Sequence, residues 1–379
     1  MPLFELSSQF RHWRYSKEEL AAVRDEVIEQ AVQRVKDNIE RERAQLHPAT
    51  NGGDEQVPAE AVPPPPDEIE YLTVDDEVEL VKYYLTQVSS LCGAFRFSEN
   101  VQATAMTYLK RFYLRNTCMD YHPKNVMLTC VFLATKTENC PCSIDSFASK
   151  VKTPTEDILS LEFLVSQSLR FEYKVHHAHL AAGGLLLDMQ TASIPLETLE
   201  QAYTQSRAYI RASRLTDLEF IYTPAQIALA SFRLTDPKAV ESWLGFKQTR
   251  RKRYVISQIE PKSKMPTSGK SGKAGAGTAV QDDSTADENG VKQTELDTEK
   301  LIDVLALIGD VILEAKENPV DKVKVTDIDK RLRWARNPDK NPNSLMYKKR
   351  QAQEQAYRDE KAKQRAAAQP PNDDGSVFD

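Results

Sequence analysis

The strongest constraint on the fold of this chain is an internal repeat with a constant offset. The motif Tyr121-His122-Pro123 recurs 101 residues later as Tyr222-Thr223-Pro224, and the same distance along the chain separates Tyr108 from Tyr209. This period exceeds the ~20–50 residues of a solenoid repeat, so the sequence predicts a duplicated domain. The matching positions after each motif are Val126, Leu128, Cys130 and Leu133 in the first copy, and Ile227, Leu229, Ser231 and Leu234 in the second.

Each copy is predicted to be helical. Residues 126–134 would be apolar on every side of a helix, which is typical of a helix surrounded by other helices. Pro123 suits the first turn of that helix, because an N–H group there would have no intrahelical partner. Residues 77–92 and 100–115 carry apolar side chains at a spacing of three and four. No comparable stretch alternates like a strand, so the predicted fold class is all-α.

Two more helices are predicted outside the repeat. One covers residues 16–43 and begins with a capping box in which Ser16 is the N-cap. The other covers residues 325–335. Trp13 and Trp334 adjoin or lie in these helices, and a tryptophan buries a large apolar area. We therefore expect both helices to pack on the repeated domains and to help bind a partner.

Polar, Pro-rich and Gly-rich segments divide the chain. The run of prolines at 63–66 and Gly52-Gly53 exclude a helix over residues 47–67. Residues 261–297 hold almost no large apolar side chain, which predicts a disordered insertion. Residues 344–368 are expected to form at most a charged helix that packs poorly. The predicted parts are an N-terminal helical extension (1–46), a flexible linker (47–74), a first domain (75–175), a linker (176–195), a second domain with the insertion (196–320), a C-terminal helix (321–336) and a charged tail (337–379).

Charge and cysteine content exclude several functional classes. Lys and Arg number 50 against 56 Asp and Glu, which gives a net charge of −6. Direct nucleic-acid binding needs a basic surface, so it is not expected. The longest apolar runs are far shorter than the ~18 residues that cross a bilayer, and no membrane contact is expected. Five cysteines are an odd number, and Cys130 lies in an apolar run, which indicates a reducing compartment, cytosol or nucleus.

Several blocks of the sequence resemble the cyclin family. Residues 108–114 (YLKRFYL), followed by residues 127–130 (MLTC) and 133–136 (LATK), are similar to a first cyclin box. Residues 7–16 (SSQFRHWRYS) and 215–229 are similar to the cyclin H branch of that family. The resemblance implies an all-α fold of two tandem five-helix cyclin boxes with flanking N- and C-terminal helices. The Met-Arg-x-x-Leu docking motif of cell-cycle cyclins is absent from the first box.

The same resemblance implies a function and a set of partners. It implies a non-catalytic subunit that activates a cyclin-dependent Ser/Thr kinase of the TFIIH-associated, CDK-activating type, and so supports phosphorylation of the RNA polymerase II C-terminal domain. The implied partners are the kinase catalytic subunit, a RING-finger assembly factor and the TFIIH core, in the nucleus and without a cofactor. The implied kinase contacts are Lys136, Glu162, Phe171 and Tyr173.

The residues themselves leave two interpretations open at these positions. Lys136 ends the predicted central helix, where a cation also suits the negative helix terminus. Glu162 lies at the edge of the apolar stripe of a helix predicted over residues 156–169, so it needs either a partner side chain or an interface. Phe171 and Tyr173 follow that helix and would otherwise pack in the core.

One basic cluster and one group of potential metal ligands are further candidate sites. The run Arg250, Arg251, Lys252 and Arg253 precedes the polar insertion and is interpreted either as a nuclear import signal or as a solvated helix end. Cys140 and Cys142, with the three histidines His176, His177 and His179, have ligand chemistry but not the spacing of a known zinc cage, so no metal site is expected.

Two other functional classes compete with the cyclin interpretation. A DNA-binding general transcription factor of the TFIIB type shares the duplicated helical fold, but it carries an N-terminal zinc ribbon, and this chain has no cysteine before Cys92. A helical prenyl-diphosphate enzyme would use acids such as those at residues 75–79 to hold magnesium. Such an enzyme needs a second acidic cluster, and the candidate, Asp282-Asp283, falls in the predicted insertion. A phosphate loop at residues 268–271 is rejected, because position 264 is Lys rather than Gly.

Overall fold

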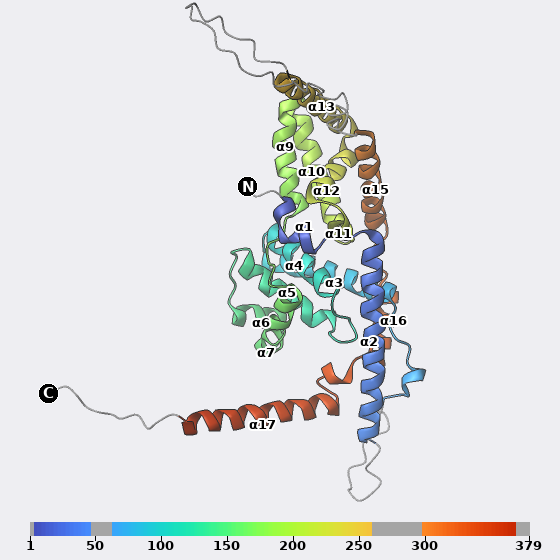
Figure 1. Ribbon diagram of the computed structural model, residues 1–379, viewed down its shortest axis with the longest axis vertical. Coiled ribbons are helices and arrows are strands. Elements are labelled where there is room, and N and C mark those ends of the chain that lie inside the picture. Colours follow the sequence, from blue (N-terminus) through green and yellow to red (C-terminus); the bar gives the residue numbers. More distant parts are fainter. Residues whose placement is uncertain (1–3, 47–62, 260–297, 369–379) are drawn as a thin grey trace, which may run out of the picture. The chain divides into compact units, whose positions relative to one another are not determined.

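The computed structural model describes residues 4–46, 63–259 and 298–368, and within these ranges every regular element is a helix (Figure 1). The predicted all-α fold class is therefore confirmed. The described residues form two compact units, one from residues 1–175 with 319–379 and one from residues 176–318. The predicted insertion at 261–297 and most of the predicted linker at 47–62 lie outside the described residues.

The first unit is built around the predicted central helix, α5 (Pro123–Thr137). Every residue from 126 to 135 is buried, as an all-round apolar surface requires. Helices α3 (Val74–Phe95), α4 (Glu99–Phe112), α7 (Thr155–Leu159) and α8 (Glu162–Ser168) all contact α5. Helix α6 (Ile144–Val151) packs against α7.

The single helix expected over residues 156–169 is wrong, because the structure divides it into α7 and α8. The break falls at Ser160 and Leu161. The Ser160 hydroxyl donates to the carbonyl oxygen of Asp157 at 3.2 Å, and serine bonded to its own helix in this way favours a bend. The bend turns both short helices against α5, so Ile158 and Val165 are buried there.

The second unit repeats this plan around α12 (Pro224–Thr235). Thr223 and Gln226 form a capping box at its start, and Pro224 occupies the first turn as Pro123 does in α5. The two Tyr-x-Pro motifs thus open the central helices of the two units. The surrounding helices are α9 (Ala178–Met189), α10 (Leu196–Ser213), α11 (Leu218–Ile221), α13 (Pro237–Ile259) and α15 (Thr298–Glu317).

The structure differs from the linker expected over residues 176–195, because α9 occupies most of it and belongs to the second unit. Ala182 and Met189 are buried on the side of α9 that faces α12 and α10. Sequence reasoning missed this helix because it has no polar face to give periodicity, no side-chain N-cap and the pair Gly183-Gly184 in its middle.

The helices at both ends of the chain pack on the first unit, as expected. Helix α2 (Lys17–Leu46) begins with the predicted capping box, in which the Ser16 N–H donates to Glu19 at 2.7 Å and the Glu19 N–H donates to Ser16 at 3.0 Å. Helix α16 (Lys322–Ala335) contacts α3 and fixes it by an ion pair of 2.9 Å between Arg331 and Asp76. Helix α17 (Leu345–Ala368) is almost fully exposed from residue 351 to 364, as its charged sequence predicts.

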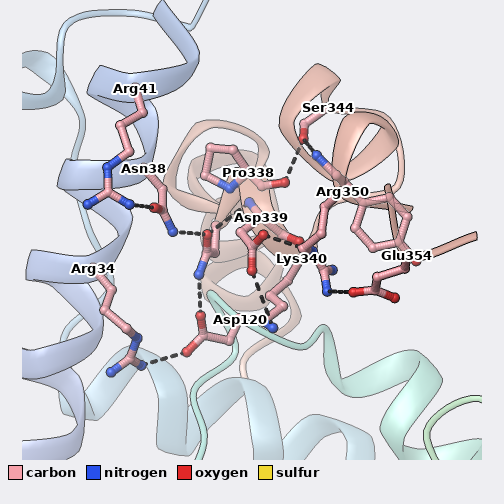
Figure 2. A network of polar contacts seen from close by, with 12 residues as sticks. Arg34, Asn38, Arg41, Asp120, Pro338, Asp339, Lys340, Ser344, Arg350 and Glu354 are labelled. Atoms are coloured by element: carbon pink, nitrogen blue, oxygen red, sulfur yellow. Dashed lines mark hydrogen bonds and ion pairs between the residues drawn. The ribbon is translucent and has the colours of Figure 1, made fainter. Parts of the chain in front are cut away.

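Asn337 joins the two terminal segments to the first box. Its side chain is 2% exposed; its Oδ1 accepts from Asn38 of α2 at 2.9 Å, and its Nδ2 donates to Asp120 at 2.7 Å. Arg34 of α2 donates to the other oxygen of Asp120 at 2.8 Å. Figure 2 shows Arg34 and Asn38 on one side of this network and the start of α17 on the other. The backbone N–H of Asn337 also donates to the carbonyl oxygen of Met119 at 2.9 Å.

The acids at residues 75–79 serve the fold of the first unit. Asp76 completes a capping box with Thr73 and pairs with Arg331. Glu77 is buried, and its carboxylate accepts the Cys118 N–H at 2.7 Å. Burial raises the pKa of Glu77 to about 8, although the bond from Cys118 and the charge of Arg24 act in the opposite direction.

Asn337→Ala is expected to lower the free energy of unfolding by about 1–3 kcal/mol, because Asn38 and Asp120 each lose a buried hydrogen-bond partner. Urea denaturation measures this loss. Asn343→Ala removes the same side chain from an exposed position of the neighbouring turn and serves as the control, with unchanged stability expected. Equal stabilities of the two variants would contradict a stabilising role for the Asn337 network.

Glu77→Gln is expected to flatten the pH dependence of stability between about pH 4.5 and pH 8. In that window the folded protein retains the Glu77 proton that the unfolded chain releases, so stability falls as pH rises and levels off above the folded pKa. Chemical denaturation at pH 5, 6.5 and 8 measures the slope. The control is Asp75→Asn on the exposed neighbour, which should keep the wild-type slope.

Candidate functional site

Lys136 and Glu162, predicted separately from the sequence, lie together on the surface of the first unit. Lys136 is in the last turn of α5 and Glu162 is the first residue of α8. The Lys136 Nζ atom lies 2.5 Å from a carboxylate oxygen of Glu162 and 4.5 Å from the ring centre of Phe132. The two charged side chains are 44% and 26% exposed, so the pair remains accessible to a partner.

A row of aromatic side chains continues from this ion pair. Phe163 follows Glu162 directly and is 70% exposed. Its ring centre lies 6.2 Å from that of Phe171, which is 53% exposed, and the Phe171 ring lies 6.5 Å from the ring of Tyr173. Exposed aromatic rings in contact with one another are typical of a protein-binding surface. We call these residues (Lys136, Glu162, Phe163, Phe171 and Tyr173) the charged–aromatic surface.

Sequence reasoning missed Phe163, although a signal was present. In a continuous helix over residues 156–169, Phe163 lies about 140° from Ile158 at ~100° per residue, on the polar side. A phenylalanine on the polar face of a predicted helix is unusual, and that position could have marked it as a contact residue.

The backbone of the turn after α8 is strained. Arg170 and Phe171 are consecutive non-glycine residues with φ angles of 56° and 58°. Left-handed backbone costs about 1–2 kcal/mol for each such residue. Hydrogen bonds hold the turn closed: the Arg170 N–H donates to Gln167 and the Phe171 N–H donates to Ser166, both at 2.9 Å. The Phe171 side chain in this turn is 53% exposed.

Helix α4 fixes the segment beyond the turn. The Tyr108 hydroxyl donates to the carbonyl oxygen of Tyr173 at 2.6 Å, and Arg111 donates to that of Glu172 at 3.4 Å. Burial raises the pKa of Tyr108, so its hydroxyl stays a donor. Tyr108 belongs to the internal repeat, and here it positions one of the aromatic residues of the charged–aromatic surface.

Trp13 packs inside the first unit and does not face a partner. It follows the short helix α1 (Ser8–His12) and is 1% exposed. Its Nε1 atom donates to Glu172 at 2.7 Å, and the Arg111 guanidinium lies 4.7 Å from its ring centre. Any contribution of Trp13 to a partner interface is therefore indirect. Trp334 is half-buried, with Arg333 at 5.2 Å from its ring centre.

The remaining candidate residues do not join the charged–aromatic surface. Arg250 is exposed on α13, and the side chains of Arg251, Lys252 and Arg253 lie outside the described residues. Cys140 and Cys142 are partly buried in the loop between α5 and α6. In the part of the chain that the structure describes, no group of three or more potential ligands is placed to hold a metal ion. Nor is any described helix long and apolar enough to cross a membrane.

Comparison with known proteins identifies the family. Residues 71–174 match the cyclin N-terminal domain, and residues 177–312 match the cyclin C-terminal domain. The chain belongs to the cyclin family. Both expected boxes are thereby confirmed, and the second match begins at α9, in agreement with the two structural units.

The relatives of this cyclin include proteins of the cyclin H branch. Cyclin-H of Xenopus laevis is 30% identical over 64% of this chain and 72% of its own length. Cyclin mcs2 of Schizosaccharomyces pombe is 27% identical over 94% of this chain and 93% of its own. Cyclin CCL1 of Saccharomyces cerevisiae is 33% identical over 64% of this chain, and the alignment spans only 60% of that protein.

Two solved structures share the fold. A chain of the CAK complex of Chaetomium thermophilum has a TM-score of 0.65 at 23% identity, covering 93% of this chain and 94% of that chain. A chain of the yeast TFIIK complex (Kin28/Ccl1/Tfb3) has a TM-score of 0.53 at 24% identity, covering 82% of this chain and all of that chain. As a cyclin, the protein is a regulatory partner of a cyclin-dependent kinase and not itself an enzyme.

Arg170→Gly is expected to stabilise the free protein by about 1 kcal/mol, because glycine adopts a positive φ angle without the clash of a Cβ atom. The substitution also removes a cation near Arg115, whose pKa is lowered first by burial and then by the charge of Arg170. Urea denaturation measures the gain. Lys174→Gly is the control: it is exposed, its φ angle is not positive, and it should lose up to about 1 kcal/mol. A loss of stability in Arg170→Gly would contradict the strained turn.

Proposed function

We propose that this cyclin binds and activates a cyclin-dependent kinase of the TFIIH-associated, CDK-activating type. The proposal is supported by the relatives named cyclin H and by the likeness of the fold to chains of the CAK and TFIIK complexes. The observation that carries it is the charged–aromatic surface, where an accessible ion pair and exposed aromatic rings lie side by side on the first box.

The ion pair supplies specificity once it is desolvated. In the free cyclin the pair is exposed and contributes about 0–1 kcal/mol to stability. A kinase that covers it excludes water, and each charge then needs a partner in the interface. Phe163 and Phe171, the most exposed aromatic residues of the surface, supply the apolar anchors that usually dominate binding energy.

Activation follows from a shift in the kinase population. A surface that binds the active arrangement of the kinase more tightly than the inactive one increases the active fraction. In protein kinases the active arrangement brings a lysine–glutamate pair into place, which orients ATP. The fixed backbone of residues 170–173 suits this role, because a rigid surface binds one arrangement of its partner better than others.

The finer parts of the proposal concern the complex and its place in the cell. We assign to it a RING-finger assembly factor and the TFIIH core as further partners, and phosphorylation of the RNA polymerase II C-terminal domain as its output. The yeast complex contains Kin28 and Tfb3 beside Ccl1, and Ccl1 is a relative of this chain. The complex acts in the nucleus, with Arg250, Arg251, Lys252 and Arg253 as the import signal.

Lys136→Ala and Glu162→Ala are each expected to weaken kinase binding by about 2–5 kcal/mol, because each leaves one charge of the pair unpaired in a desolvated interface. The double variant should lose less than the sum of the single losses, since both residues act through one contact. Calorimetric titration of the purified cyclin with the recombinant kinase subunit measures the affinities. The melting temperature of each free variant should stay close to that of wild type.

The control is a matched exposed pair in the same unit. Arg350 and Glu354 of α17 lie 3.1 Å apart and are 35% and 42% exposed. Glu354→Ala should therefore bind the kinase as wild type does. Wild-type affinity in both Lys136→Ala and Glu162→Ala would remove the charged–aromatic surface from the kinase interface and overturn the proposal.

A further inference from the structure

We propose that the N-terminal segment, residues 8–15, positions the kinase-binding turn through Glu172, so that Trp13 and His12 control kinase binding without touching the kinase. This inference rests on the proposed function and adds to it a device that positions the turn. It assigns a role to Glu172, a residue between the two predicted contacts Phe171 and Tyr173.

The Glu172 carboxylate is held by two contacts, one with Trp13 and one with His12, which we call the Glu172 clamp. One carboxylate oxygen accepts the Trp13 indole N–H at 2.7 Å, and the other lies 2.5 Å from Nδ1 of His12. The carbonyl oxygen of the same residue accepts from Arg111. Side-chain and backbone atoms of Glu172 are therefore held at once. Trp13 and His12, which hold the side chain, lie 159 and 160 positions away, and Arg111 of α4, which holds the carbonyl, lies 61 positions away.

The surroundings of Trp13 favour its hydrogen bond to the Glu172 carboxylate. The guanidinium groups of Arg111 and Arg115 lie 4.7 Å and 5.6 Å from its ring centre, so the ring lies against two cations while its N–H donates to the anion. With 1% of its surface exposed, Trp13 cannot reach another protein. Its only available effect on a partner passes through the residues that it fixes.

The turn needs such a clamp because its backbone is unfavourable on its own. Arg170 and Phe171 both have positive φ angles, and they precede Glu172 directly. If the clamp opens, the two residues can relax toward ordinary backbone conformations, and the Phe171 ring leaves its place between Phe163 and Tyr173. A smaller fraction of the cyclin would then be competent to bind.

This mechanism has a kinetic signature that separates it from direct contact. When only part of a protein is competent to bind, the apparent association rate is the rate of the fully competent protein multiplied by that fraction, and the complex once formed dissociates at its usual rate. A lost contact in the interface instead raises the dissociation rate. The two roles are thus distinguishable even where the affinities are equal.

The test variant is Trp13→Phe, which keeps an aromatic ring beside Arg111 and removes the N–H donor without changing the charge. Surface plasmon resonance with the immobilised recombinant kinase subunit measures both rates for the full-length cyclin. We expect the association rate to fall about tenfold and the dissociation rate to stay within about twofold of wild type. Glu162→Ala is the reference for direct contact and should raise the dissociation rate. Leu6→Ala, an exposed residue of the same N-terminal region, is the control and should keep both rates.

His12→Ala is the second variant, because this side chain is 40% exposed and its removal does not threaten the fold. The substitution removes the His12 contact with the Glu172 carboxylate and should lower the association rate about threefold. Wild-type rates in both Trp13→Phe and His12→Ala, or a raised dissociation rate like that of Glu162→Ala, would overturn the positioning role while leaving the proposed function intact. Absence of binding by the wild-type cyclin would overturn the proposed function and this inference with it.

Discussion

The burial of α5 from residue 126 to residue 135 is the constraint on which the rest of the first unit depends. Its side chains are apolar all round from residue 126 to 134, so helices must cover it on every side. The buried stretch stops near the end of the helix, where Lys136 lies at the surface. The covering helices α7 and α8 are held by the same requirement, and α8 brings Glu162 to the end of α5. The position of the charged–aromatic surface thus follows from the packing of α7 and α8 against α5.

Segments far apart in the sequence complete this arrangement. Helix α2, the loop that holds Asp120 and the chain after α16 meet at Asn337, whose hydrogen bonds to Asn38, Met119 and Asp120 join these three segments (Figure 2). The residues that precede α2 meet the turn after α8 at Glu172. Both contacts use buried polar groups, which have strict geometric requirements and so specify one arrangement more sharply than apolar packing does. The terminal extensions are therefore structural parts of the first box.

Local sequence patterns predicted the fold class and part of the site. The all-round apolar run and the Tyr-x-Pro repeat placed two central helices, and the capping box placed the start of α2. Lys136 and Glu162 were named as kinase contacts by the family resemblance, because their positions at a helix end and beside an apolar stripe left two interpretations open. Two segments were misjudged: the break at Ser160 depends on packing against α5, and α9 lacks the polar face that reveals a helix by periodicity. Phe163, which is 70% exposed, was missed although its nominal angle already placed it on the polar side of the expected helix.

The sequence by itself determined that this protein is a duplicated all-helical protein with two buried central helices, because apolar periodicity and helix-start signals are local properties. Only the tertiary structure decided that Lys136 meets Glu162 at 2.5 Å and that Trp13 turns inward to hold Glu172. Both contacts join residues that are 26 and 159 positions apart. Propensity and periodicity extend over a few turns of helix, whereas such contacts arise from the way whole helices pack around a core.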